Sequence, residues 1–167
     1  VCLASPLRDV YKRQIHRLVR SHVGSMDEAL DVTQASFVAA FAALNRYDVT
    51  RPFQVWMSRI VINKCHDWRR RRAVRNFFAL ALPLGEADGV ADDAPLPDQA
   101  IGAEQQLAQA MKAIAALPSS LKDTLILRTI DEKSEAETAE ILGISQKAVE
   151  TRLYRARARL SEILKKV

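Results

Sequence analysis

Residues 134–157 read SEAETAEILGISQKAVETRLYRAR, and their pattern is the strongest structural signal in the chain. Ala139 lies four residues before Gly143, and Val149 lies six residues after it. A small residue lets two helices cross closely, a glycine relieves a crowded turn, and a branched apolar residue fixes the second helix to a core. This spacing predicts a helix-turn-helix, whose second helix is free to enter the major groove of DNA.

The residues after the turn divide between two faces of that second helix. Apolar residues recur with a period of three to four, which marks a buried stripe: Val149, Leu153, Ala156 and Leu160. Long basic side chains can contact phosphates or a guanine edge, so we assign the polar residues to DNA contact: Lys147, Thr151, Arg152, Tyr154 and Arg155. The alternative is a solvated basic helix end, stabilised by the helix dipole.

Composition and charge favour an all-α protein that binds a polyanion. Apolar residues make up 49% of the chain, and only 5 glycines occur. The net charge is +5 and the isoelectric point is near 9.5. Residues 69–72 are consecutive arginines, whereas residues 76–103 contain no Lys or Arg. That stretch is acidic, so two basic segments flank an acidic strip.

Several classes of function find no support in the sequence. Cys2 and Cys65 do not form a disulfide framework, and we expect Cys65 to be a small packed residue. The three histidines lack the spacing of a metal site, and no nucleophile–base pair suggests an enzyme. No apolar run is long enough to cross a membrane, and no signal peptide is recognisable. We therefore expect a cytoplasmic protein that is not an enzyme and needs no cofactor.

The N-terminal half predicts three helices. Residues 1–14 show little periodicity, and we interpret them as a ragged or non-native terminus. A helix is expected from Ile15 to about Val23, and a second begins with Asp27 as N-cap. Its expected buried stripe comprises Leu30, Thr33, Phe37, Phe41 and Leu44. A third helix should run from Pro52 to about Arg72.

The rest of the chain predicts a linker followed by four helices. Residues 76–103 are rich in proline and acidic residues, although the apolar Phe77, Phe78, Leu80 and Leu82 suggest that part of this stretch docks on a surface. Helices are expected at about 104–116, 119–130, 134–142 and 146–166. The sequence thus predicts two small helical domains, at residues 15–75 and 104–167, joined by the acidic linker.

Together these residues resemble a sigma factor of bacterial RNA polymerase, of the extracytoplasmic-function class of the sigma-70 family. The resemblance covers most of residues 15–167. In the first domain it is carried by three stretches, DVTQASF at residues 31–37, PFQVWMSRIVIN at residues 52–63 and the arginine run. In the second domain it is carried by Ala116-Leu-Pro118, Leu127-Arg128 and the helix-turn-helix.

The resemblance implies a subunit that gives RNA polymerase its promoter specificity. The first domain would bind the core polymerase through Asp31, Gln34 and Phe37. It would also melt promoter DNA and hold the minus-ten strand through these residues: Arg59, Asn63, Lys64, Arg69, Arg70, Arg71 and Arg72. The helix-turn-helix would read the minus-thirty-five element, although Glu150 stands where relatives often carry a basic residue. An anti-sigma factor is a further partner that the resemblance suggests.

Alternatives remain for several residues and for the whole chain. Asn63 could be a satisfied buried amide, Asp31 could complement its helix dipole, and the arginine run could be a solvated helix end. Trp56 and Trp68 fit a core better than a base-stacking platform. The competing function is a helix-turn-helix regulator that binds operator DNA as a dimer, independently of polymerase.

Overall fold

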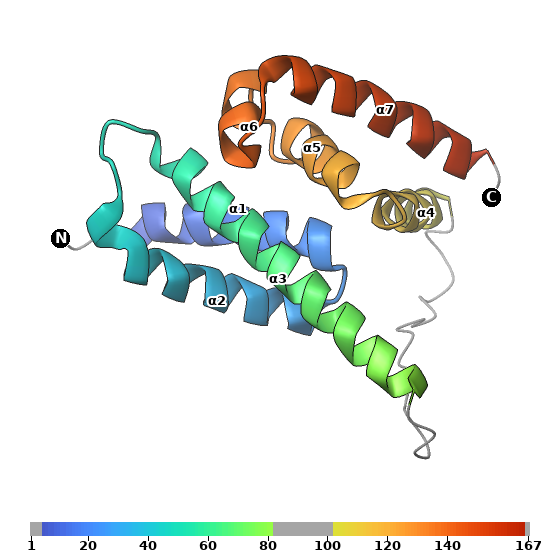
Figure 1. The fold of residues 1–167 in the computed structure, drawn as a ribbon, viewed down its shortest axis with the longest axis horizontal. Helices are drawn as coiled ribbons and strands as arrows, with labels where there is room; N and C mark the ends of the chain where they lie inside the picture. The colour runs from blue at the N-terminus through green and yellow to red at the C-terminus, as the bar shows by residue number, and fades with distance from the viewer. Residues whose placement is uncertain (1–4, 82–101, 166–167) are drawn as a thin grey trace.

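The computed structural model describes residues 5–81 and 102–165, and all regular structure within these ranges is helical. The predicted all-α class is therefore confirmed. Figure 1 shows two groups of helices, α1–α3 and α4–α7. The helices are α1 (Ser5–Val23), α2 (Met26–Ala43), the short 3-10 turn η1 (Leu44–Arg46), α3 (Phe53–Ala81), α4 (Ala103–Ala115), α5 (Ser119–Thr129), α6 (Glu135–Leu142) and α7 (Gln146–Leu164).

Helices α1, α2 and α3 pack on one another around an apolar core. Leu18 of α1 and Met57 and Val61 of α3 are almost completely buried. Cys65 lies in the same core as a free thiol, and burial raises its pKa to about 12. A thiol with so high a pKa is a poor nucleophile, so the prediction that Cys65 is a packed residue is confirmed.

Helix α2 turns a different face to the core from the one that we predicted. Within the expected stripe Thr33 is buried and Phe37 is half-buried, but the exposed fractions are 47% for Leu30, 74% for Phe41 and 51% for Leu44. The packed face consists of smaller residues: Ala29, Val32, Thr33, Ser36 and Ala40. Small residues let α2 approach its neighbours closely, which leaves a row of large apolar side chains on the surface.

The first two helices begin earlier than predicted. Helix α1 begins at Ser5 rather than at Ile15, so residues 5–14 belong to a regular helix. The N-cap of α2 is Ser25 rather than Asp27, and Asp27 lies in the first turn, where its charge complements the helix dipole.

Helix α3 ends later than predicted. It continues to Ala81 rather than stopping near Arg72, because residues 73–82 contain neither proline nor glycine to terminate it. Phe77 and Phe78 lie on this extension and are 68% and 57% exposed, so the expectation that they dock on a surface is wrong. The Leu80 and Leu82 side chains and the acidic residues of the expected linker lie outside the described residues.

The helix-turn-helix of α6 and α7 is confirmed, with boundaries within two residues of those predicted. A capping box starts α6, because Ser134 accepts a hydrogen bond from the Glu137 amide while the Glu137 carboxylate accepts one from the Ser134 amide. Gly143 ends α6 in the left-handed conformation, with φ 66°. Ala139 and Val149 are 7% and 0% exposed, as the spacing around the turn required.

Gly143→Ala should lower the free energy of unfolding by about 1–2 kcal/mol, because a Cβ disfavours the left-handed conformation. Space is not the cause, since the nearest atom to an added Cβ is Arg59 Nη2 at 4.0 Å. Gly102→Ala is the matched control, because Gly102 has φ −88° and an added Cβ meets nothing within 4 Å. Urea denaturation of both variants checks the prediction, and equal stabilities would show that the turn carries no such constraint.

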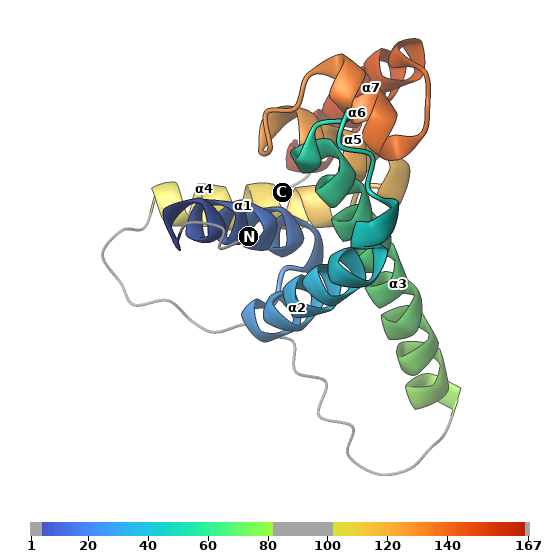
Figure 2. The same ribbon diagram turned by 90° about the vertical axis from the view of Figure 1, so that its left-hand side faces the viewer.

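The two groups of helices share one apolar cluster, which the sequence did not predict. Ile126 and Leu127 of α5 and Ile141 of α6 pack in the same cluster as the core of α1–α3. Helix α5 contacts α1, and α6 contacts α3. Figures 1 and 2 show α7 on the side of α4–α7 that faces away from α1–α3, and the C-terminal end of α3 projecting beyond the bundle. The two predicted helical domains therefore pack against each other in the part of the chain that the structure describes.

Candidate nucleic-acid interface

The outer face of α7 presents the polar residues that the sequence assigned to DNA. Ser145 caps the helix by accepting a hydrogen bond from the Ala148 amide, and Val149 and Ala156 on the opposite face are completely buried. The exposed side chains on the outer face are Lys147, Thr151, Tyr154 and Arg155, while Arg152 is half-buried. Tyr154 is 76% exposed, so its aromatic ring presents apolar surface to solvent beside the arginines.

Contacts within α7 decide which of these groups are free. Lys147 Nζ lies 2.7 Å from Glu150 Oε2, and this hydrogen bond raises the pKa of Lys147. Thr151 Oγ1 donates to the Lys147 carbonyl oxygen at 2.9 Å. Arg155 is exposed and makes no ion pair with the described residues, so it is the cation on this face best able to meet a base or phosphate.

Helix α3 carries the second predicted group of DNA contacts. Arg59 and Asn63 are exposed and Lys64 is half-buried, so the buried-amide alternative for Asn63 is excluded. Asn63 lines an open groove of about 650 Å³ together with Arg70 and with Ser119 of α5. Arg59 lies beside the turn of the helix-turn-helix, where its guanidinium approaches Gly143.

The arginine run does not form a single cationic strip. Consecutive residues of a helix point about 100° apart, so the four side chains leave α3 in different directions. Arg69 turns inward, and its Nη2 lies 3.5 Å from Asp123 Oδ1. Arg71 is exposed and has no ion-pair partner among the described residues. In this conformation Arg71 is therefore the member of the run most open to a phosphate.

The other two arginines of the run are paired on the surface. Arg70 forms an ion pair with Asp67 one turn earlier. Arg72 Nη1 lies 3.0 Å from Glu28 of α2, and its guanidinium stacks 5.2 Å from the centre of the Trp68 ring. Exposed pairs of this kind are worth less than about 1 kcal/mol, so a phosphate can displace them.

Helix α2 presents the predicted polymerase-binding residues beside an apolar surface. Asp31 and Gln34 are exposed, and Phe37 is half-buried against the core. Large apolar side chains surround them on the surface: Met26, Leu30, Val38, Phe41 and Leu44. A row of exposed apolar residues rimmed by polar groups is typical of a protein-binding surface.

The described residues offer no sign of a metal site or a membrane span. They contain no group of three or more His, Cys, Asp or Glu residues placed to hold a metal ion. None of the described helices combines the length and the apolar character needed to cross a bilayer.

Comparison with known proteins connects both helix groups to one family. The model of Sigma-70 region 2 matches residues 7–75, and that of Sigma-70, region 4 matches residues 107–160. The RNA polymerase sigma factor CnrH of Cupriavidus metallidurans is 43% identical over 137 residues, which cover 80% of this chain and 72% of that protein. The chain belongs to the sigma-70 family. Its class is the extracytoplasmic-function (ECF) class, as in the similar SigW of Bacillus subtilis, 29% identical over 94% of this chain and 86% of SigW.

Solved structures of sigma factors share this fold. CnrH in complex with the cytosolic domain of CnrY is 31% identical, with a TM-score of 0.69 over 96% of this chain and 86% of that one. The sigma factor RpoE of Bartonella quintana, solved with the anti-sigma factor NepR, has a TM-score of 0.73 at 21% identity over 97% of this chain and 98% of that one, which shows the likeness in fold.

Region 2 and region 4 of this sigma factor meet across a buried polar group that the sequence analysis missed. We call it the Asp123 cluster, and it consists of His22, His66, Arg69, Lys122 and Asp123. Asp123 is 2% exposed, and its partners lie far away in the sequence. No local pattern marks such a group, because the chain has to fold before its members meet.

The geometry of the Asp123 cluster joins α5 to α1 and α3. Asp123 Oδ2 lies 2.6 Å from His66 Nε2, and Oδ1 lies 3.2 Å from His22 Nε2. Burial alone would raise the pKa of the Asp123 carboxyl, but the contacts with both histidines outweigh it and hold that pKa well below its usual range. Lys122 Nζ donates to the His22 carbonyl oxygen at 3.1 Å, and burial lowers the pKa of Lys122.

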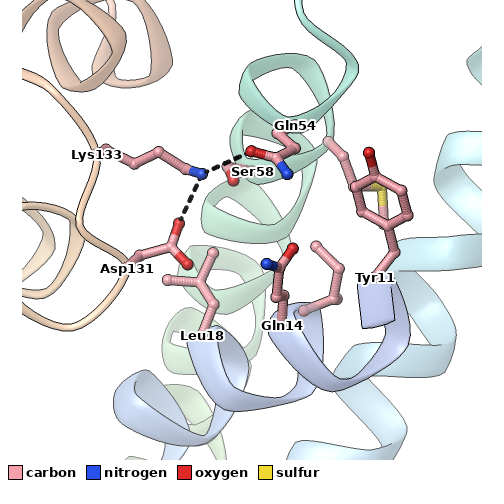
Figure 3. A pocket seen from close by; sticks show the side chains of 9 residues that line it. Tyr11, Gln14, Leu18, Gln54, Ser58, Asp131 and Lys133 are labelled. Carbon is pink, nitrogen blue, oxygen red and sulfur yellow. Dashed lines mark hydrogen bonds and ion pairs between the residues drawn. The ribbon is translucent and has the colours of Figure 1, made fainter. Parts of the chain in front are cut away.

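A second polar contact between the two regions surrounds a small cavity, shown in Figure 3. Lys133 Nζ lies 3.5 Å from Asp131 Oδ2 and 3.4 Å from Gln54 Oε1 of α3. Burial raises the pKa of Asp131 although the charge of Lys133 opposes this. The cavity has a volume of about 10 Å³, which is room for about one water molecule and for no small-molecule substrate.

Proposed function

We propose that this sigma factor binds core RNA polymerase and directs it to promoters, where region 4 reads the minus-thirty-five element and region 2 captures and melts the minus-ten element. The observation that carries the proposal is the outer face of α7. It holds Arg155, which has no ion pair with the described residues, and an exposed tyrosine on a capped helix-turn-helix, and the same chain carries a sigma-70 region 2. The role is regulatory rather than enzymatic, and it places the protein in the cytoplasm with polymerase.

In region 4, α7 would lie in the major groove with its buried stripe toward α5 and α6. Arg155 is the proposed base-reading residue, because a free guanidinium can form two hydrogen bonds with a guanine edge. Lys147 and Arg152 are assigned to phosphates, and the Thr151 methyl group and the Tyr154 ring are assigned to apolar contact with the groove. The Lys147–Glu150 pair lowers the net positive charge at the start of the helix.

In region 2, the surface of α3 would hold the separated minus-ten strand. Arg59 and Asn63 lie about one turn apart along the helix and Lys64 follows directly, so the three can contact one strand. Extracting a base from the duplex costs a few kcal/mol, which contacts in the bound state must return. Arg70 and Arg71, in the exposed C-terminal half of α3, are assigned to phosphates, a contribution that weakens as salt rises.

The exposed face of α2 is the proposed contact with core polymerase. Asp31 and Gln34 would supply polar contacts, and Leu30, Val38 and Phe41 would supply buried apolar area. Functionally the chain then divides into region 2 at residues 15–75, a linker at residues 76–103 and region 4 at residues 104–167. An anti-sigma factor is a further proposed partner, because sigma factors of this fold have been solved with CnrY and NepR bound.

Charge reversal at Asp31 tests the polymerase contact. Asp31→Arg should weaken binding to core polymerase by about 1–3 kcal/mol. The substitution puts a positive charge where the proposed interface is built for a negative one. Binding of duplex minus-thirty-five DNA should stay unchanged, because α2 lies away from α7. Affinity for core polymerase and for labelled duplex, measured on the same preparation, checks both. Equal loss of the two affinities would mean that the substitution had unfolded the protein.

Co-purification tests the function as a whole. A tagged full-length chain should retain core polymerase on a column at moderate salt. A helix-turn-helix regulator of the alternative kind would bind a specific duplex as a dimer and leave polymerase in the flow-through.

A further inference from the structure

We propose that the Asp123 cluster locks regions 2 and 4 in a closed state that withholds the minus-ten surface, and that the cluster must open before the promoter is bound. The closed state stands on the contacts between the two regions. Its consequence for promoter binding rests on the function proposed above.

The cluster spans the boundary between the regions and does not stabilise either one alone. Among the described residues, the ion-pair partners of the Asp123 carboxylate all come from region 2, namely His22 of α1 and His66 and Arg69 of α3. The neighbouring Lys122 also crosses the boundary, to the last turn of α1. Two consecutive residues of α5 therefore hold two of the three helices of region 2, α1 and α3.

Burial makes these contacts depend on one another. Asp123 and Lys122 are 2% and 6% exposed, so losing one partner leaves an uncompensated charge inside the interface. Without the carboxylate, the positive charges of Arg69 and Lys122 face each other with no counter-charge between them. When the regions separate, water can hydrate every member of the cluster. These groups therefore suit a contact that forms and breaks as a unit.

The closed state cannot engage both promoter elements. The minus-ten and minus-thirty-five elements lie about 25 base pairs apart, which is roughly 85 Å at 3.4 Å per base pair. Arg51, two residues before region 2 helix α3, lies 3.5 Å from Glu140 of region 4 helix α6, and Arg59 of α3 faces the turn at Gly143. With 19 residues, α7 is only roughly 29 Å long, so it cannot bridge that separation.

The closed state also occupies part of the proposed minus-ten surface. Arg69 is engaged by Asp123, and the open groove that contains Asn63 and Arg70 is bounded by Ser119 of region 4. A single strand laid along α3 would meet region 4 beside it. Separation of the regions would free Arg69 from Asp123 and would also move region 4 away from Arg59, so that both arginines could contact DNA.

Chemical cross-linking measures the closed state without DNA or polymerase. In a Cys2→Ser background, Arg51→Cys and Glu140→Cys place two thiols where the native side chains meet, and a short, reducible bis-maleimide should join them rapidly. Cys65 will not compete, because it is buried and its thiol pKa is about 12. Adding Asp123→Asn should slow cross-linking at least about tenfold, because an uncompensated buried charge then opposes closure.

Asp67→Asn is the matched control, because it removes the same charge from a pair that lies within α3. It should leave the cross-linking rate unchanged. His66→Ala provides a second test should Asp123→Asn lose helical circular dichroism, since the His66 side chain is 39% exposed and its removal should slow cross-linking without unfolding. Rates for Asp123→Asn and His66→Ala that equal that of Asp67→Asn would overturn the lock.

The cross-linked protein then tests whether the closed state prevents promoter binding. Together with core polymerase it should bind a promoter fragment at least about tenfold more weakly than the uncross-linked protein, and reduction of the linker should restore binding, since contact between the regions excludes the required span. Full binding in the cross-linked state would overturn the withholding role. Failure of the uncross-linked protein to bind promoter with polymerase would instead count against the proposed function, while the cross-linking rates still decide whether the lock exists.

Discussion

Leu127→Ala should lower the free energy of unfolding by about 2–5 kcal/mol, the cost of deleting a fully buried leucine and leaving a cavity. Leu127 is 0% exposed and belongs to the apolar cluster that joins α5 to α1 and α3. Because the cavity would border both regions, neither can refill it alone. Urea denaturation followed by circular dichroism of the full chain measures the loss.

Leu30→Ala is the matched control for that substitution. Leu30 has the same side chain but is 47% exposed on α2, and the sequence pattern had placed it in the core. We expect it to cost less than about 1 kcal/mol, because much of its surface already meets water. If the two variants were equally destabilised, the face of α2 described above would be wrong.

Arg155→Ala should weaken binding to the minus-thirty-five duplex by about 1–3 kcal/mol and relax base preference at one position. Arg155 is the exposed arginine of the outer α7 face that has no ion pair with the described residues, so its guanidinium is free for two hydrogen bonds to a base. Competition between duplexes that differ at single base pairs, at fixed salt, measures both quantities.

Arg159→Ala on the same helix separates base reading from charge. Arg159 is exposed and pairs with Glu162, 2.8 Å away. Its removal should weaken all sequences alike and only slightly, because it deletes a general electrostatic term. An unchanged base preference in the Arg155→Ala variant would remove the base-reading assignment from Arg155.

The helix-turn-helix could be predicted closely because its signals are local. The capping box at Ser134, the left-handed Gly143 and the N-cap at Ser145 each fix a helix end within a few residues of chain. The apolar period after the turn then determines which face of α7 meets the core. As a result, the exposed residues assigned to DNA lie on one outer surface, as the sequence indicated.

The core face of α2 could not be predicted by counting large apolar residues. Ala29, Ser36 and Ala40 are buried because α2 lies close to α1 and α3, and small residues fit in that space. The large residues were left on the surface. Their exposure is consistent with the contact to core polymerase that we propose for this face of α2.

The contact between regions 2 and 4 had no signal in the sequence. Nothing in the spacing of the sequence pairs His22 or His66 with a carboxylate in another segment, and Asp123 is one acidic residue of α5 among others in the chain. Only the packing of α5 against region 2 brings them together, 57 residues apart in the case of His66 and Asp123. Long-range polar contacts of this kind depend on the tertiary fold rather than on periodicity.

Run-off transcription with purified core polymerase on a library of randomised promoters measures the proposed activity most directly. We expect transcripts to appear only when this protein is added and to start downstream of two shared motifs, about 25 base pairs apart, which the two regions contact. The absence of promoter-specific transcripts, in a preparation that still protects a specific duplex on its own, would contradict the assignment of this chain as a promoter-specificity subunit.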